Sequence, residues 1–365
     1  MTLKQERNYG IDLLRLVAML MVTILHVLMH GGILRDNDNL SAQQLLSWFL
    51  EYAARGAVNL FALVSGYVGL QSKYRVTNFA VLWLQVFLYS FGIAAVVAVI
   101  RPALCGGAEL IGYAFPVITK QYWYFSAYAC LFVFMPLLNA GVNALSKRSL
   151  RRIVIAMLLV FSVAASIAKE TSHNPFGLKD GFSGLWLMIL YVVGACVRKN
   201  GLWEKASQPA LLGVWFGCSA ASLALRVAAE QIGIRLTGAA YRAEFLLAYF
   251  SPFLVLGSIA LLLFFSRLQC GKAAKRLIAF LAPAAFGVYV IHRHPLIWEH
   301  LLYHRFAAFA DLSPLALVGA VLLSALGIFA VCLLIDLLRV RVFQLLKIRQ
   351  RCLALEEKIF QRKKQ

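Results

Sequence analysis

Residues 11–26 read IDLLRLVAMLMVTILH, an apolar run that is long enough to enter a lipid bilayer but contains Asp12, Arg15 and His26. An ionisable group is costly inside a membrane-spanning helix and therefore indicates a functional site. In an α-helix, the spacing from Arg15 to His26 returns to within about 20° of the same direction after about 16 Å of rise. We therefore expect both side chains to lie on one helix face and to border one cavity that leads from a membrane surface into the bilayer.

The composition of the chain excludes a soluble protein. Of its 365 residues, 61% are hydrophobic and only 14% are charged, which is more apolar surface than a soluble protein of this length could bury. The 7 cysteines are scattered, with no Cys-x-x-Cys spacing and no Cys/His cluster. The sequence therefore predicts neither a metal site nor a disulfide framework.

The apolar runs predict about ten membrane-spanning helices, so we expect an all-α, polytopic transmembrane helical bundle. The expected spans are 10–30, 47–70, 78–100, 122–140, 153–168, 184–197, 210–229, 245–265, 277–298 and 314–338. An even number of spans places both termini on one side of the membrane. Lysine and arginine are concentrated in the loops on that side, so the positive-inside rule predicts that both termini are cytoplasmic.

Two regions are expected along the chain. Residues 1–340 contain the spans, and residues 341–365 form a basic amphipathic cytoplasmic tail. The tail alternates Lys and Arg with Leu, Ile and Phe, which is typical of a helix on the anionic inner leaflet, so membrane lipids are an expected partner. The net charge of +20 is also compatible with nucleic-acid binding, but its placement in loops and tail favours the membrane, and we expect no nucleic-acid partner.

The polar residues of the first two spans each allow two interpretations. Arg15 either pairs with Asp12 as a membrane anchor or receives an anion at the inner face. His26 either packs in the core or acts as a general base, since imidazole accepts a proton near neutral pH. In the second span, Glu51, Arg55 and Asn59 recur at every fourth position, which indicates a polar stripe facing protein or water. The Glu51–Arg55 pair fits a structural ion pair as well as a substrate contact.

Further candidate residues lie near the predicted membrane surfaces. Lys73 and Arg75 follow the second span, where they either set the topology or bind phosphates. Tyr122 and Trp123 open the fourth span and suit either an interfacial aromatic belt or a site. His292 ends the ninth span at a depth that matches His26, so the two imidazoles are candidates for one shared site.

These pieces together resemble the integral-membrane acyltransferase family 3, whose members acylate cell-surface sugars. The motifs that carry the resemblance are DLLR at 12–15 with His26, VNLF at 58–61, SGY at 65–67, YWYF at 122–125, PLLN at 136–139 and YVIH at 289–292. They cover residues 8–340 approximately. Many family members have Gly at the position three residues before the Trp, where this chain has Lys120.

The resemblance implies a cytoplasmic acyl-CoA donor, usually acetyl-CoA, and an acceptor on the far side. It implies that the chain is an O-acyltransferase of the bacterial cytoplasmic (inner) membrane, acting on a sugar hydroxyl of a cell-surface or lipid-linked polysaccharide. It also implies that Arg15 and His26 form the functional pair and that Trp123 lies near the acyl path. No metal is implied, and the oligomeric state is not predicted.

A mechanism follows from the residue types. Arg15, Lys73 and Arg75 would form a basic mouth for the phosphates of the donor. His26 would deprotonate the sugar hydroxyl or accept the acyl group transiently, and both routes fit the sequence. An oxyanion partner is also needed, for which Arg55, Tyr122 and Trp123 are candidates.

The alternative function is an exporter or transporter of polysaccharide precursors without acyl transfer. Such a protein also needs polar residues inside the membrane. The two halves of this chain show no matching repeat, which disfavours an inverted-repeat transporter.

Overall fold

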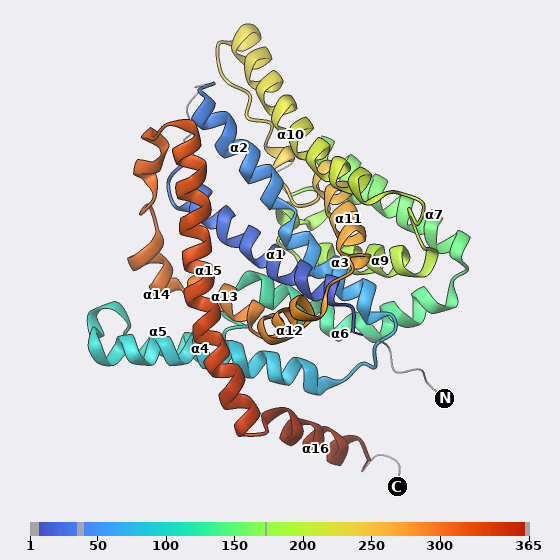
Figure 1. Ribbon diagram of the computed structural model, residues 1–365, viewed down its shortest axis with the longest axis vertical. Coiled ribbons are helices and arrows are strands. Elements are labelled where there is room, and N and C mark those ends of the chain that lie inside the picture. Colours follow the sequence, from blue (N-terminus) through green and yellow to red (C-terminus); the bar gives the residue numbers. More distant parts are fainter. Residues whose placement is uncertain (1–6, 35–39, 172–173, 362–365) are drawn as a thin grey trace.

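The computed structural model describes residues 7–34, 40–171 and 174–361, and within them every regular element is a helix (Figure 1). The expected all-α class is therefore confirmed. The main helices are α1 Tyr9–Leu25, α2 Ala42–Arg55, α3 Ala57–Gly69, α4 Val76–Ile100, α5 Gly107–Ala114, α6 Trp123–Ala144, α7 Lys147–Leu158, α8 Ala165–Ala168, α9 Gly184–Asn200, α10 Gln208–Thr237, α11 Pro252–Ser266, α12 Lys272–Leu281, α13 Ala285–His292, α14 Pro295–Ile297, α15 Pro314–Leu345 and α16 Ile348–Gln361. Apolar chains fold this way in lipid because a helix satisfies its own backbone hydrogen bonds.

The described residues contain 7 helical segments long and apolar enough to cross a membrane. They are Tyr9–His30, Val76–Ile100, Trp123–Ala144, Lys147–Ala168, Gln208–Thr237, Lys272–His292 and Pro314–Leu345. Counting the pair Pro175–Gly181 and Gly184–Asn200, which is bent by 81°, as one span raises the number to 8. The expected number of ten is not confirmed.

Two of the expected spans account for the difference. The run 47–70 is divided at Gly56 into α2 and α3, and a Cβ at Gly56 would lie 2.7 Å from Ser258 Oγ of α11. The run 245–265 yields only α11, which starts at Pro252 and has 15 residues. At 1.5 Å per residue, α11 is about 22 Å long, which is shorter than the roughly 30 Å hydrocarbon core of a bilayer.

Helix α1 is the inner helix of the bundle. It packs against α2, α3, α11, α12, α13 and α15, and it lies in the middle of the view in Figure 1. In the most apolar stretch of Tyr9–His30, 67% of the residues are buried in the protein, compared with 22–44% for the other six spans. The polar face of α1 therefore meets protein and cavities rather than lipid, as a helix that carries charge requires.

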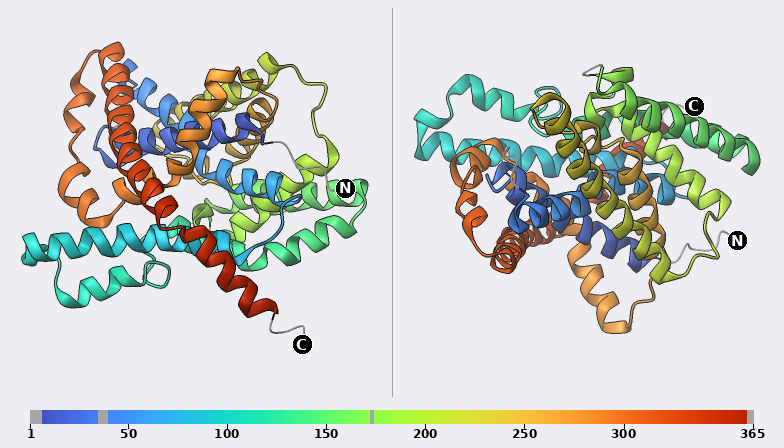
Figure 2. Two further views of the ribbon diagram at one scale, coloured as in Figure 1. Left: turned by 60° about the horizontal axis from the view of Figure 1, so that its bottom comes forward. Right: turned by 90° about the horizontal axis from the view of Figure 1, so that it is seen from above.

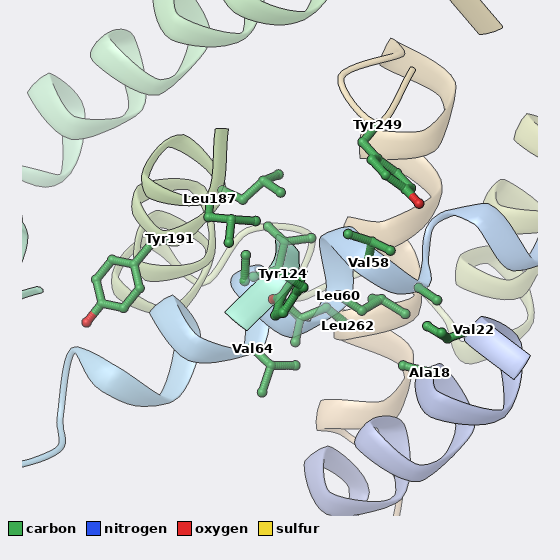
Figure 3. Packing of buried hydrophobic residues seen from close by; sticks show 14 of the residues in the cluster. Ala18, Val22, Val58, Leu60, Val64, Tyr124, Leu187, Tyr191, Tyr249 and Leu262 are labelled. Carbon is green, nitrogen blue, oxygen red and sulfur yellow. The ribbon is translucent and has the colours of Figure 1, made fainter. Parts of the chain in front are cut away.

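Small residues bring α3 and α9 into close contact. A Cβ at Gly66 would lie 1.9 Å from the carbonyl oxygen of Tyr191, and one at Gly194 would lie 2.1 Å from that of Leu63. Only glycine allows two helix backbones to approach this closely. Figure 3 shows buried apolar residues near this contact, among them Leu60 and Val64 of α3 and Leu187 and Tyr191 of α9. The contact holds α3 and the middle of α9 side by side.

The carboxyl-terminal segment docks on α4. Helix α15 continues through residue 340 to Leu345, and α16 begins after a bend at Lys347, whose φ is 51° (Figure 2). Glu356 caps α4, since its carboxylate accepts the backbone N–H groups of Val76 and Thr77, each at 3.0 Å, and the Thr77 hydroxyl. These hydrogen bonds, first of all that from the Thr77 hydroxyl, lower the pKa of Glu356. The last part of the expected tail, residues 362–365, lies outside the described residues.

Candidate active site

The carboxyl-terminal end of the first span is a π-helical turn, His26–His30, in which the N–H of Gly31 donates to the carbonyl of His26 at 2.9 Å. Single π turns inside α-helices are rare and often occur at functional sites. Here the turn buries Val27 and Leu28 and leaves His26 partly buried and His30 exposed. The sequence gives no signal for it, because the apolar periodicity of the run continues through these residues.

His26 forms a hydrogen-bonded pair with His292. The distance between His26 Nδ1 and His292 Nε2 is 2.7 Å, and His292 Nδ1 lies 2.5 Å from the carbonyl oxygen of Val288. A carbonyl only accepts, so His292 carries its proton on Nδ1 and accepts from His26 Nδ1–H through Nε2. When both rings are neutral, His26 Nε2 is left with a free lone pair. The sequence predicted that the two imidazoles lie at a similar depth in the membrane and share one site, and the structure brings them together. Their chemical roles remain predictions.

His26 lines a cavity of about 280 Å³, which we call the histidine chamber. Its walls are mostly aromatic and aliphatic, with charged groups at Glu51, Arg55 and Arg293 (Figure 3 labels Val22, Val58, Tyr124 and Tyr249 among the lining residues). The lining residues are Met19, Val22, Leu25, His26, Met29, His30, Glu51, Arg55, Val58, Phe61, Trp123, Tyr124, Phe182, Tyr249, Phe286, Tyr289 and Arg293. Apolar walls keep water away and strengthen the electrostatic interactions inside the chamber.

Aromatic rings surround the chamber residues. Trp123 stacks on Tyr249 with 6.0 Å between ring centroids, which places the predicted Trp123 on the chamber wall. The ring of Trp298, which does not itself line the chamber, lies 5.4 Å from that of His26, and the Arg293 guanidinium lies 4.6 Å from the Trp298 centroid. Tyr122 is 1% exposed and does not line the chamber. Of the three expected oxyanion partners, Arg55 and Trp123 therefore reach the chamber, and Arg293 joins them.

Arg55 and Asn59, which belong to the polar stripe expected in the second span, form hydrogen bonds to the loop that carries Tyr249. Arg55 pairs with Glu51 at 2.7 Å and also donates to the carbonyl of Leu247. Asn59 donates to the carbonyl of Tyr249 at 2.8 Å and accepts from Trp186 Nε1. The Glu51–Arg55 ion pair exists and lines the chamber as well, so its structural and ligand-facing interpretations are compatible.

Arg15 lines a different cavity, of about 540 Å³, which we call the arginine cavity. Its lining residues are Arg7, Asn8, Ile11, Asp12, Arg15, Tyr67, Val68 and Arg198. Asp12 bridges two of its guanidinium groups, at 2.6 Å to Arg7 and 2.7 Å to Arg15. Three guanidinium groups against one carboxylate leave a net positive site that suits phosphates.

The third cation of this cavity is Arg198 of α9. It stacks on the Tyr67 ring at 5.1 Å and donates to the Tyr67 hydroxyl and to Gln71. The sequence did not single out Arg198, because only the close contact of α3 with α9 brings it beside Tyr67. The expected partners Lys73 and Arg75 do not line the cavity; Lys73 is exposed in the turn after α3, and Arg75 precedes α4.

The expectation of one cavity shared by Arg15 and His26 is wrong. The two residues lie on one face of α1, but the arginine cavity and the histidine chamber have no lining residue in common. Met19 is the chamber residue of α1 nearest to Arg15 in the chain, and Phe61 is the chamber residue of α3 nearest to Tyr67. The junction at Met19 and Phe61 is therefore the part of the chamber wall nearest to the arginine cavity along α1 and α3, and periodicity on one helix could not reveal that there are two cavities.

Within residues 7–34, 40–171 and 174–361, no group of three or more His, Cys, Asp or Glu side chains is arranged to hold a metal ion. The family described as an acyltransferase domain matches residues 8–337, a stretch that includes the histidine pair, the histidine chamber and every lining residue of the arginine cavity except Arg7. No curated protein and no solved structure matches the chain.

Proposed function

The chain belongs to acyltransferase family 3, and on this premise we propose that it transfers an acetyl group from cytoplasmic acetyl-CoA to a sugar hydroxyl of a cell-surface or lipid-linked polysaccharide. The observation that carries the proposal is the lone pair of His26 Nε2, which is set by the hydrogen bonds through His292 to Val288 at the wall of the histidine chamber. Such an imidazole is suited to take a proton from a hydroxyl.

The proposed setting is the bacterial cytoplasmic membrane, with both termini in the cytoplasm. The arginine cavity then opens to the cytoplasm, where acetyl-CoA is found, and the histidine chamber lies toward the opposite surface. In this arrangement the basic tail, residues 341–365, lies at the inner leaflet, where its cations attract anionic lipids.

In the proposed transfer, the sugar hydroxyl gives its proton to His26 Nε2 while its oxygen attacks the thioester carbon. The new C–O bond forms, the C–S bond breaks, and the departing thiolate takes the proton from the His26 imidazolium. His292 acts as a positioning residue: it accepts from His26 Nδ1–H and so stabilises the imidazolium as it forms. Arg55 or Arg293, both of which line the chamber, would stabilise the negative charge that develops on the carbonyl oxygen.

Binding of the donor begins at the arginine cavity. Arg7, Arg15 and Arg198 would hold the phosphates, while Asp12 keeps two of these guanidinium groups in position. The thin pantetheine arm would then cross the junction at Met19 and Phe61. This crossing has to cover about 16 Å along α1 to bring the thioester to His26.

Two routes agree with this geometry. In direct transfer, the hydroxyl attacks the thioester while both are in the chamber. In the relay, His26 Nε2 attacks first, CoA leaves, and the acetyl-imidazole passes the group to the hydroxyl. CoA release by the protein without acceptor, in a burst of one equivalent per protein, indicates the relay.

Labelled acetyl-CoA and the purified protein test the function itself. The acceptor is the glycan fraction extracted from host cells from which the gene has been deleted. We expect label to enter the glycan and CoA to be released in equal amounts. Movement of the unmodified glycan across proteoliposomes with no label incorporated would instead support the exporter.

A further inference from the structure

A third cavity, of about 280 Å³, adjoins the histidine chamber. It is lined by Trp48, Arg55, Lys169, Asp180, Phe182, Arg226, Arg242, Glu244, Leu247 and Ala248. Arg55 and Phe182 line both spaces, whereas no residue is shared with the arginine cavity. A ligand in this third cavity therefore lies next to the chamber and away from the donor phosphates. We call it the vestibule.

Ion pairs line the vestibule. Lys169 Nζ lies 2.8 Å from Asp180 Oδ1 and 3.9 Å from Glu244 Oε2. The Lys169 side chain is only 8% exposed, whereas those of Asp180 and Glu244 are 39% and 68% exposed. The amino group is thus buried beside two carboxylates that are themselves partly exposed, and carboxylate oxygens can accept hydroxyl groups.

Elsewhere in the lining of the vestibule, the guanidinium of Arg226 lies over the ring of Trp48. Arg226 lies 3.7 Å from the centroid of Trp48 and pairs with Glu230 at 2.7 Å. Its Nε is buried and has no hydrogen-bond partner among the described residues. A buried donor without a partner is unfavourable, which is the kind of group that a bound hydroxyl or carbonyl would satisfy.

The loops that form the vestibule are strained and tied together. Lys179, Asp180 and Ala243 have φ values of 50°, 57° and 46°, in the left-handed region that residues other than glycine rarely adopt. The N–H of Tyr249 donates to the carbonyl of Asp180 at 2.9 Å and joins the two loops. Non-glycine residues held in this region tend to occur where a ligand is clamped.

The charges indicate which ligand fits. Four cations line the vestibule: Arg55, Lys169, Arg226 and Arg242. In the described residues, the first three are each paired with a carboxylate, whereas the arginine cavity has three guanidinium groups against one carboxylate. A cation that is already paired with a carboxylate attracts a further anion less, while the carboxylate oxygens can still accept hydroxyl groups. We propose that the vestibule is the acceptor subsite and binds a neutral sugar unit adjacent to the one that is acylated. This inference rests on the proposed function.

The test measures steady-state transfer from labelled acetyl-CoA to the glycan from gene-deleted cells. Glu244→Gln and Asp180→Asn each remove a charged acceptor of hydroxyl groups, so we expect the KM for the glycan to rise about tenfold. We expect the KM for acetyl-CoA and the release of CoA without acceptor to stay within twofold. Glu170→Gln is the matched control, since Glu170 is exposed beside Lys169 in the chain but does not line the vestibule.

Two outcomes would overturn the subsite. The first is a KM for the glycan within twofold of the parent value in both variants. The second is a KM that rises for a neutral glycan but not for a polyanionic glycan, together with a neutral oligosaccharide fragment of the acceptor that fails to inhibit transfer. These outcomes require a parent protein that transfers acetyl groups. A parent protein that transfers none refutes the proposed function itself, and the subsite with it.

Discussion

Replacing His292 tests whether the hydrogen bond behind His26 contributes to the reaction. His292 is 1% exposed, and its Nε2 lies 2.7 Å from His26 Nδ1. If this bond strengthens when His26 becomes charged, it contributes about 1.5–3 kcal/mol to the transition state, the range for hydrogen bonds to charged groups. At 1.36 kcal/mol per factor of ten, His292→Ala should lower kcat roughly 10- to 100-fold.

The assay is acetyl transfer per folded protein, measured with saturating glycan and varied acetyl-CoA. We expect the KM for acetyl-CoA to change less than twofold, because Arg15 and its partners line a separate cavity. His292→Gln should recover part of the rate, since its amide oxygen can accept from His26 Nδ1–H. A purely structural role would lower the amount of folded protein without this recovery.

His294→Ala is the matched control for His292→Ala. His294 is also buried, but its ring bonds to the carbonyl of Ser90 and stacks on Tyr113, away from His26. We expect His294→Ala to reduce stability while keeping kcat. A His292→Ala protein with a kcat within twofold of the parent would refute the reasoning.

Three further predictions concern the donor path, a strained residue and the tail. Met19→Trp should block the junction between the two cavities and lower the rate of transfer roughly tenfold or more, with little change in acetyl-CoA binding. Leu20→Trp, on another face of α1, is the control and should keep the parent rate of transfer. Equal rates in the two variants would show that the donor does not pass the junction. Lys120→Gly should raise the free energy of unfolding by about 0.5–1 kcal/mol, because Lys120 has a φ of 55°, a conformation that glycine adopts without strain. A lower melting temperature of the variant would contradict this. The pKa of Glu356 is lowered, so its contribution to docking α16 is complete above the pKa of an exposed glutamate and is lost as the pH falls through its own lower pKa. Hydrogen exchange of α16 should therefore quicken at acid pH, and Glu356→Gln should show the fast exchange already at pH 7; protection that is independent of pH would exclude the cap.

Features that depend on one helix could be predicted from the sequence. The spacing of Asp12 and Arg15 and that of Glu51 and Arg55 indicated side chains that pair on one face, and both pairs form in the structure. The apolar runs likewise predicted the helical class. Each of these features follows from the 3.6-residue period of a helix and the length of an apolar run.

Features that depend on contacts between distant segments could not be predicted. Arg198 reaches the arginine cavity only because glycines let α9 approach α3. Tyr249 is held at the chamber because its carbonyl accepts from Asn59 and its N–H donates to the carbonyl of Asp180. The presence of two cavities instead of one likewise depends on residues of several helices, among them Phe61 of α3 in the chamber wall. Lys120 is an intermediate case, since the glycine that the family resemblance led us to expect at this position would suit the left-handed backbone found there.

The most direct test of the central claim compares His26→Ala with His300→Ala in acetyl transfer from labelled acetyl-CoA. His300 is exposed and lines neither cavity, so it controls for the loss of an imidazole elsewhere. We predict that His26→Ala abolishes transfer to the glycan while the folded protein still binds acetyl-CoA, and that His300→Ala keeps the parent rate. Transfer by His26→Ala at a rate within a few-fold of the parent would contradict a mechanism in which His26 handles the proton.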